Sequence, residues 1–203
     1  MNTTTTRHRN NRRRGVRGVG LVELLLSLSI SASILVAVAY AVDVSFKTYS
    51  VNQEQTGLMQ RARITMYRIT TQIRTTSAHN PVSAAALADF KAGKICTDTG
   101  ILLIDDDGNQ TSYKYDPAAK TVTCIDVNGN EFVALKGVEA FQIKFEPMKS
   151  EQSQRTGGVF DLLMRATVML TVSSQGQNPD IDDKFASQMI TLNASVVPRC
   201  NVW

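Results

Sequence analysis

Histidine is nearly absent from this sequence, and so are the motifs that most enzymes need. The 203 residues include two histidines, His8 and His79. Nucleophilic catalysis usually requires a histidine placed beside a serine or cysteine. The sequence offers no credible arrangement of that kind. A P-loop and a GxGxxG fingerprint are missing as well. We therefore expect a protein that is not an enzyme and has no cofactor. His79 precedes Asn80-Pro81, where we expect it to cap a helix end or to face solvent.

Cysteine is also scarce. The chain has Cys96, Cys124 and Cys200, with no CxxC pair and no cysteine–histidine spacing typical of a metal site. Three cysteines cannot all pair within one chain. We favour a Cys96–Cys124 disulfide, because both residues belong to the same short stretch of expected strands; three unpaired thiols remain the alternative.

Acidic residues are missing from residues 1–18, which hold six arginines. The net charge of +4 comes from this segment, because the rest of the chain has 16 basic and 18 acidic residues. The basic charge is confined to one end, so it does not indicate a nucleic-acid partner.

Proline does not occur between Val19 and Asn80, which permits one long helix. The segment Leu21–Val42 is mostly apolar and has Glu23 as its one charged residue. As a helix it would span roughly 33 Å, which matches a hydrocarbon core of about 30 Å. Because the arginines precede it, we expect one pass through the inner (cytoplasmic) membrane. The N-terminus would be cytoplasmic and the rest of the chain exported.

The second half of this helix is expected to be amphipathic. Apolar residues recur at three-, four- and seven-residue steps, at Val51, Leu58, Ala62, Met66, Ile69 and Ile73. We predict one helix over residues 19–76, whose second half packs against a sheet.

Glu23 is the unusual residue of the membrane segment. A carboxylate within a bilayer costs about 2.5–3.5 kcal/mol on insertion scales and usually has a partner. The alternative is that Glu23 lies near enough to the membrane surface to be hydrated. Further along, Ser29, Ser33, Ala37 and Ala41 fall four apart, a spacing of small residues that lets helices approach closely, although such residues are also common in membrane helices.

Strand patterns follow from Ile101 onward. We predict a short helix over residues 84–90 and then strands over 101–105, 111–116, 121–127, 131–135, 138–146, 162–173 and 188–197. The short turns favour antiparallel neighbours. The fold class is therefore α+β, with one long N-terminal helix packed on an antiparallel sheet of about five to seven strands.

Three acidic clusters bear on metal binding. Asp105–Asp107 and the cluster of Asp126, Asn128 and Asn130 are better explained as hairpin turns. The polar linker with Asp180, Asp182 and Asp183 is less constrained and remains a weak calcium candidate. No metal site is predicted.

Residues 17–30, Arg-Gly-Val-Gly-Leu-Val-Glu-Leu-Leu-Leu-Ser-Leu-Ser-Ile, resemble the processing motif of type IV prepilins and type II secretion pseudopilins. In that family a basic leader ends in glycine, and a glutamate is fifth in the mature chain. The resemblance implies cleavage after Gly18 by prepilin peptidase and N-methylation of Val19, with Glu23 fifth; a cut after Gly20 would make it third. The new amine at Val19 and the Glu23 carboxylate would then neutralise each other, either within one chain or between neighbouring chains.

The resemblance also implies an organisation and partners. Residues 1–18 would be the leader, 19–42 the membrane and polymerisation helix, 43–79 its amphipathic continuation and 80–203 an exported β-rich head. The partners would be other pilin-like subunits and the inner-membrane assembly platform. Residues 135–145, followed by two long strands, are similar to the J-type minor pseudopilins and PilW-like minor pilins.

Two functions therefore compete. The first is a minor pilin or pseudopilin that leaves the inner membrane for a filament. The second is an exported, soluble, β-rich binding domain, released by a signal peptidase that cuts after Ala39-Tyr40-Ala41.

Overall fold

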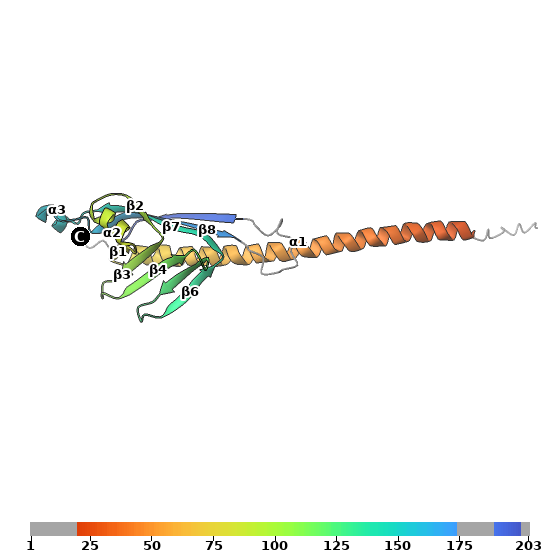
Figure 1. Cartoon of the computed structure of the whole chain (residues 1–203), viewed down its shortest axis with the longest axis horizontal. Helices are drawn as coiled ribbons and strands as arrows, with labels where there is room; N and C mark the ends of the chain where they lie inside the picture. The colour runs from red at the N-terminus through yellow and green to blue at the C-terminus, as the bar shows by residue number, and fades with distance from the viewer. Residues whose placement is uncertain (1–19, 174–188, 200–203) are drawn as a thin grey trace, which may run out of the picture. The chain divides into compact units, whose positions relative to one another are not determined.

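A computed structural model describes residues 20–173 and 189–199 of the chain (Figure 1). Several residues singled out above lie outside the described residues, namely Gly18, Val19, Asp180, Asp182, Asp183 and Cys200. The chain divides into two compact units, Met1–Phe46 and Lys47–Trp203.

The first element, α1, runs from Leu21 to Thr75 and confirms the predicted long helix. In the second unit it contributes one face to the core, where Ala62, Thr65, Met66, Ile69 and Ile73 are buried. Leu58 is partly buried on the same side. The apolar stripe that the sequence predicted is therefore the packed face of the helix.

The strands of the described residues form two antiparallel sheets. Sheet A has the order β1-β3-β4-β5-β6 and sheet B the order β2-β7-β8-β9. Sheet A contains β1 (Ala78–Pro81), β3 (Gly100–Ile104), β4 (Gln110–Asp116), β5 (Thr121–Ile125) and β6 (Glu131–Lys136). Sheet B contains β2 (Cys96–Asp98), β7 (Val138–Met148), β8 (Leu162–Ser173) and β9 (Met189–Val196).

The expectation of one sheet was wrong, and Gly137 is where the chain departs from it. This single residue connects β6 in sheet A to β7 in sheet B, with a φ of 75°. A positive φ is readily available only to glycine. Its carbonyl accepts a 2.9 Å hydrogen bond from the Ser173 amide at the end of β8. A one-residue connection therefore turns the chain from one sheet into the other, where the short spacing had suggested two neighbouring strands.

The individual elements match the sequence prediction closely. The seven predicted strands and the helix α2 (Ala84–Lys91) are all present, with ends within about two residues. The sequence did not predict β1, because its residues include His79 and Pro81 and do not alternate between apolar and polar types. It did not predict β2 either, because that strand has three residues. It also missed the short helix α3 (Glu151–Thr156), which Ser150 caps.

Both sheets and the second half of α1 share one core, in which Phe90 of α2 meets Phe145 of β7 edge to face with ring centroids 6.2 Å apart. Tyr113 of β4 is fully buried and its hydroxyl donates a 2.7 Å hydrogen bond to Gln72 Oε1 on α1. Aromatic pairs and hydrogen-bonded hydroxyls of this kind stabilise the packing of layers.

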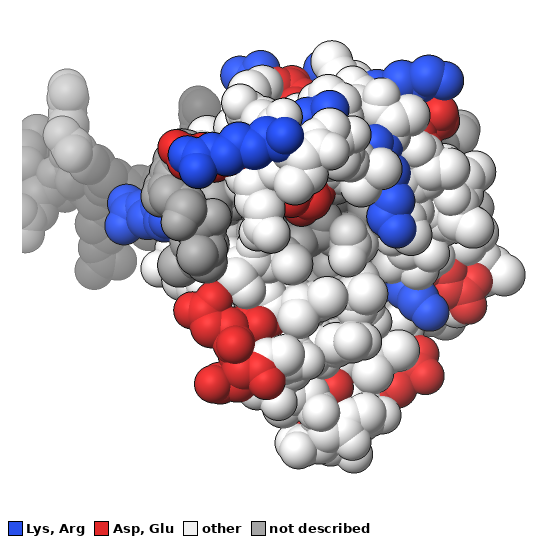
Figure 2. All heavy atoms as spheres, turned by 90° about the vertical axis from the view of Figure 1, so that its left-hand side faces the viewer, with Lys and Arg blue, Asp and Glu red and all other residues white. Residues whose placement is uncertain are grey.

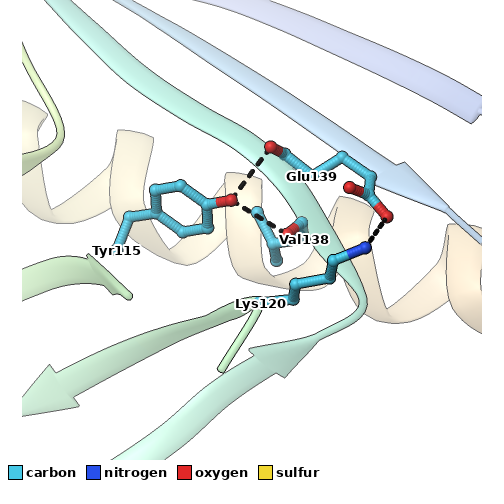
Figure 3. Close-up of polar contacts among 4 residues, drawn as sticks. All are labelled: Tyr115, Lys120, Val138 and Glu139. Carbon is cyan, nitrogen blue, oxygen red and sulfur yellow. Dashed lines mark hydrogen bonds and ion pairs between the residues drawn. The ribbon is translucent and has the colours of Figure 1, made fainter. Parts of the chain in front are cut away.

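A polar contact joins the end of β4 in sheet A to the start of β7 in sheet B (Figure 3). The Tyr115 hydroxyl of β4 lies 3.1 Å from the carbonyl oxygen of Val138 and 2.9 Å from that of Glu139, both on β7. Beside it, Lys120 Nζ lies 2.9 Å from Glu139 Oε1. One tyrosine hydroxyl and one ion pair therefore hold the start of β7. These contacts fix the position of the strand that follows Gly137.

Candidate functional site

The most exposed apolar surface in the described chain is the first half of α1. Every residue from Gly20 to Tyr49 is solvent-exposed, including large side chains from Leu21 (77% exposed) to Phe46 (70% exposed). A water-soluble protein rarely leaves an apolar surface of this extent uncovered. This segment therefore requires lipid or another protein around it.

Among the residues that the structure describes, α1 is the one helix long and apolar enough to cross a membrane. Its apolar window lies near the N-terminus and is not buried at all by the rest of the protein. The helix satisfies its own backbone groups, which a segment in hydrocarbon requires. A single long apolar N-terminal helix that could span a membrane is thus a property of the structure.

Glu23 stands in the first turn of α1, and its Oε2 accepts a 3.2 Å hydrogen bond from the Gly20 amide. A carboxylate in the first turn also faces the positive end of the helix dipole. The predicted partner of Glu23, the amine of Val19, lies outside the described residues. The carboxylate is therefore directed toward the N-terminal end of the helix.

The small-residue stripe lies on an exposed surface of α1. The hydroxyls of Ser29 and Ser33 donate 2.9 Å hydrogen bonds to the carbonyl oxygens of Leu25 and Ser29, one turn back. Internal bonds of this kind leave no hydroxyl unsatisfied in lipid. Ala37 and Ala41 continue the stripe without a polar group. The side chains of the stripe are consequently small, and the hydroxyls of Ser29 and Ser33 are hydrogen-bonded within the helix. Such a surface suits close packing of helices.

The predicted Cys96–Cys124 disulfide is not formed. Both are buried free thiols, with Cys96 in β2 of sheet B and Cys124 in β5 of sheet A. The prediction assumed that the two strands were neighbours in one sheet, whereas Cys96 pairs with Phe145 and Cys124 with Tyr113 and Phe132. Burial raises the pKa of both thiols, Cys96 further through the nearby carboxylates of Asp89 and Asp98.

His79 caps the C-terminal end of α1, which is one of the two roles that the sequence led us to expect. Its Nε2 lies 2.7 Å from the Ile73 carbonyl oxygen and 3.0 Å from Thr76 Oγ1. The sequence did not indicate that the ring is also buried, with 2% of its surface exposed. The ring therefore has a structural role, since both of these contacts are to the C-terminal end of α1.

The two acidic turns have nearly identical structures and serve as hairpin turns. Asp105 Oδ1 accepts hydrogen bonds from the amides of Asp107 and Asn109, and Asp126 Oδ1 does the same with Asn128 and Asn130. Bonds from the Asn109 side chain and from the Asn130 amide are the largest causes that lower the pKa of Asp105 and Asp126, respectively. In the described part of the chain no group of three or more His, Cys, Asp or Glu side chains is placed to hold a metal ion.

Comparisons with known proteins leave the family open. No model of a protein family matches the chain. No curated protein and no solved structure matches it either.

Proposed function

We propose that this chain is a minor pilin or pseudopilin, a structural subunit of a type IV pilus or of a type II secretion pseudopilus. The observation that carries the proposal is the uncovered first half of α1, whose apolar segment Leu21–Val42 has a single acid, Glu23, in the first turn of the helix. An ordinary membrane anchor has no need for that carboxylate. A helix that moves from lipid into a bundle of like helices does, because the acid can meet an N-terminal amine there.

In this proposal each segment has a task. Residues 1–18 form a leader that prepilin peptidase removes after Gly18, and the new N-terminus at Val19 is methylated. The α1 segment up to Val42 holds the subunit in the inner membrane, with its N-terminus in the cytoplasm, until the assembly platform transfers it to the filament. The small surfaces at Ser29, Ser33, Ala37 and Ala41 then allow neighbouring helices to approach closely. The two-sheet head is the exported, specific part.

The N-terminus of the mature protein tests the proposal. We expect mass spectrometry of the membrane-bound protein to find a chain that starts at Val19 and carries an N-methyl group. A chain that starts at Val42 would instead establish the exported soluble binding domain. Such a cut would divide α1, which runs without interruption from Leu21 to Thr75.

A further inference from the structure

The second half of α1 has an uncovered face opposite to its packed face. Ile64 and Tyr67 are 61% and 73% exposed, although they alternate along the helix with the fully buried Ala62 and Ile69. At about 100° per residue, Ile64 and Tyr67 lie together on the side turned away from the two sheets. Large apolar side chains at this spacing form a contiguous apolar spot on the helix surface.

Four arginines flank this spot on the same helix. Arg63 and Arg74 lie along one side of the Ile64–Tyr67 pair, and Arg61 and Arg68 along the other. All four are exposed. We refer to these four arginines together with Ile64 and Tyr67 as the back face.

The positive charge of the back face is uncompensated within the described chain. No Asp or Glu occurs in α1 after Glu54. Lys94, Lys120, Lys144, Arg155 and Arg165 form ion pairs, whereas no arginine of the back face forms one with a described residue. Arginine and tyrosine are also the residues most enriched at the energetic centres of protein interfaces.

A hollow extends this surface toward the N-terminal end of the unit. Gly57 has no side chain, and a Cβ placed there would meet nothing within 4 Å. Tyr49, Gln53, Thr56 and Gln60 border the hollow. A side chain of a partner can be accommodated there, about 10 Å along the helix from Ile64.

We propose that the back face binds an acidic helical surface of a different protein, a neighbouring subunit of the same filament. The inference rests on the proposed function and names the chemistry of the neighbour. The back face is narrow and extends roughly 20 Å along the helix from Arg61 to Arg74, which fits an elongated partner such as another helix. Two copies of the back face would place eight guanidinium groups against one another, and such like-charge contacts are unfavourable. The charge thus selects a neighbour that is not a second copy of this chain.

Photo-cross-linking from the back face tests this inference on the full-length protein in its native membrane. A photoreactive amino acid replaces Tyr67, and the linked peptide is sequenced by mass spectrometry. We expect a peptide of another pilin-like protein with carboxylates within one or two helical turns of the linked residue. A probe at Met164, exposed on β8 of sheet B, is the matched position and should not give that peptide.

Charge variants then separate recognition from folding. The double variant Arg63→Glu, Arg74→Glu should lower the cross-link yield at position 67 about tenfold through like-charge repulsion. Arg63→Lys with Arg74→Lys should retain most of the yield. The double variant Lys91→Glu, Arg155→Glu makes the same charge change at exposed residues of α2 and α3 and should leave the yield unchanged. Replacing the partner's carboxylates with lysine should restore cross-linking to the charge-reversed chain.

Several outcomes would overturn the inference. They are a link to a second copy of this chain, a link to lipid, a linked peptide without acids, and a yield that does not respond to charge reversal. If the mature chain starts at Val19 in that experiment, the proposed function stands and only the neighbour is wrong. A chain that starts at Val42 would reject the proposed function separately.

Discussion

The Nε2 atom of His79 lies 2.7 Å from the carbonyl oxygen of Ile73, so the first strand of sheet A caps the last turn of α1. The other ring nitrogen, Nδ1, is buried without a hydrogen-bond partner among the described residues. Burial lowers the pKa of His79 from 6.5 to about 4, against a smaller opposing effect of the bond to Ile73. The neutral ring is therefore part of the folded state.

This relationship predicts that the protein loses stability in mild acid. The unfolded state binds a proton below pH 6.5, whereas the folded state does so only near pH 4. The free energy of unfolding should therefore fall as pH decreases from 6.5 to 4, by on the order of 2 kcal/mol. Chemical denaturation of the detergent-solubilised protein at a series of pH values measures it. His79→Gln, which keeps a hydrogen-bond donor but does not titrate, should remove this part of the slope. An unchanged slope in the variant would assign it to other groups.

Tyr115→Phe should weaken the link between the sheets. The variant keeps the ring but removes the hydroxyl that reaches the carbonyl oxygens of Val138 and Glu139. A net hydrogen bond of this kind contributes about 1 kcal/mol, and the denaturation midpoint should shift accordingly. Tyr67→Phe removes a hydroxyl from a side chain that is 73% exposed and should leave the midpoint unchanged. Equal effects of the two variants would show that the contact between the sheets contributes nothing.

Gly93→Ala should destabilise the head more than Gly108→Ala. Both glycines have a positive φ, 81° and 83°, so both variants suffer similar backbone strain. A Cβ at Gly93 would lie 2.3 Å from the Phe160 ring, whereas at Gly108 it meets nothing within 4 Å. The difference between the two denaturation midpoints therefore measures the clash. The clash should lower the free energy of unfolding by about 1–2 kcal/mol more in Gly93→Ala than in Gly108→Ala. Phe160→Leu in the Gly93→Ala background should recover part of that difference. A difference near zero would mean that the ring moves aside freely.

Glu23→Leu should still insert into the membrane but assemble poorly. The substitution removes the acid of the first turn, whose predicted partner is the amine of Val19. Glu23→Gln keeps an oxygen that can accept the Gly20 amide hydrogen bond but has no charge, so it should fail in the same way. Membrane fractionation reports insertion, and co-purification of other pilin-like subunits reports assembly. Normal co-purification of either variant would show that assembly does not need the charge of Glu23.

Gly18→Ala or a bulkier residue should leave the leader attached. A normal mature N-terminus in this variant would place the processing site elsewhere. Gly20→Ala is the matched control, because a Cβ at Gly20 meets nothing within 4 Å. It should be processed as the unaltered chain is, unless the cut follows Gly20. The mass of the N-terminal peptide distinguishes these cases.

Much of the secondary structure was predictable because each element has a local pattern. The strand over residues 162–173 was predicted with the ends that the structure shows, because the alternation of apolar residues continues over its whole length. The buried stripe of α1 was also predictable, because helical periodicity determines which side chains share a face. The sequence contains the arginines of the back face and no acid after Glu54 in α1, but this pattern does not indicate that they share an uncovered surface. Only the packing showed which side of the helix stays uncovered.

The pattern of amino acids was enough to predict an apolar N-terminal helix with one acid near its start, an amphipathic continuation and a series of antiparallel strands. Tertiary structure alone decided that these strands form two sheets, that Cys96 and Cys124 lie in different ones, and that His79 is buried. The physical reason is that periodicity specifies which face of an element is buried but not against which partner. At Gly137 one residue with positive φ redirects the chain, and its effect depends on contacts with residues far away in the sequence, such as Ser173.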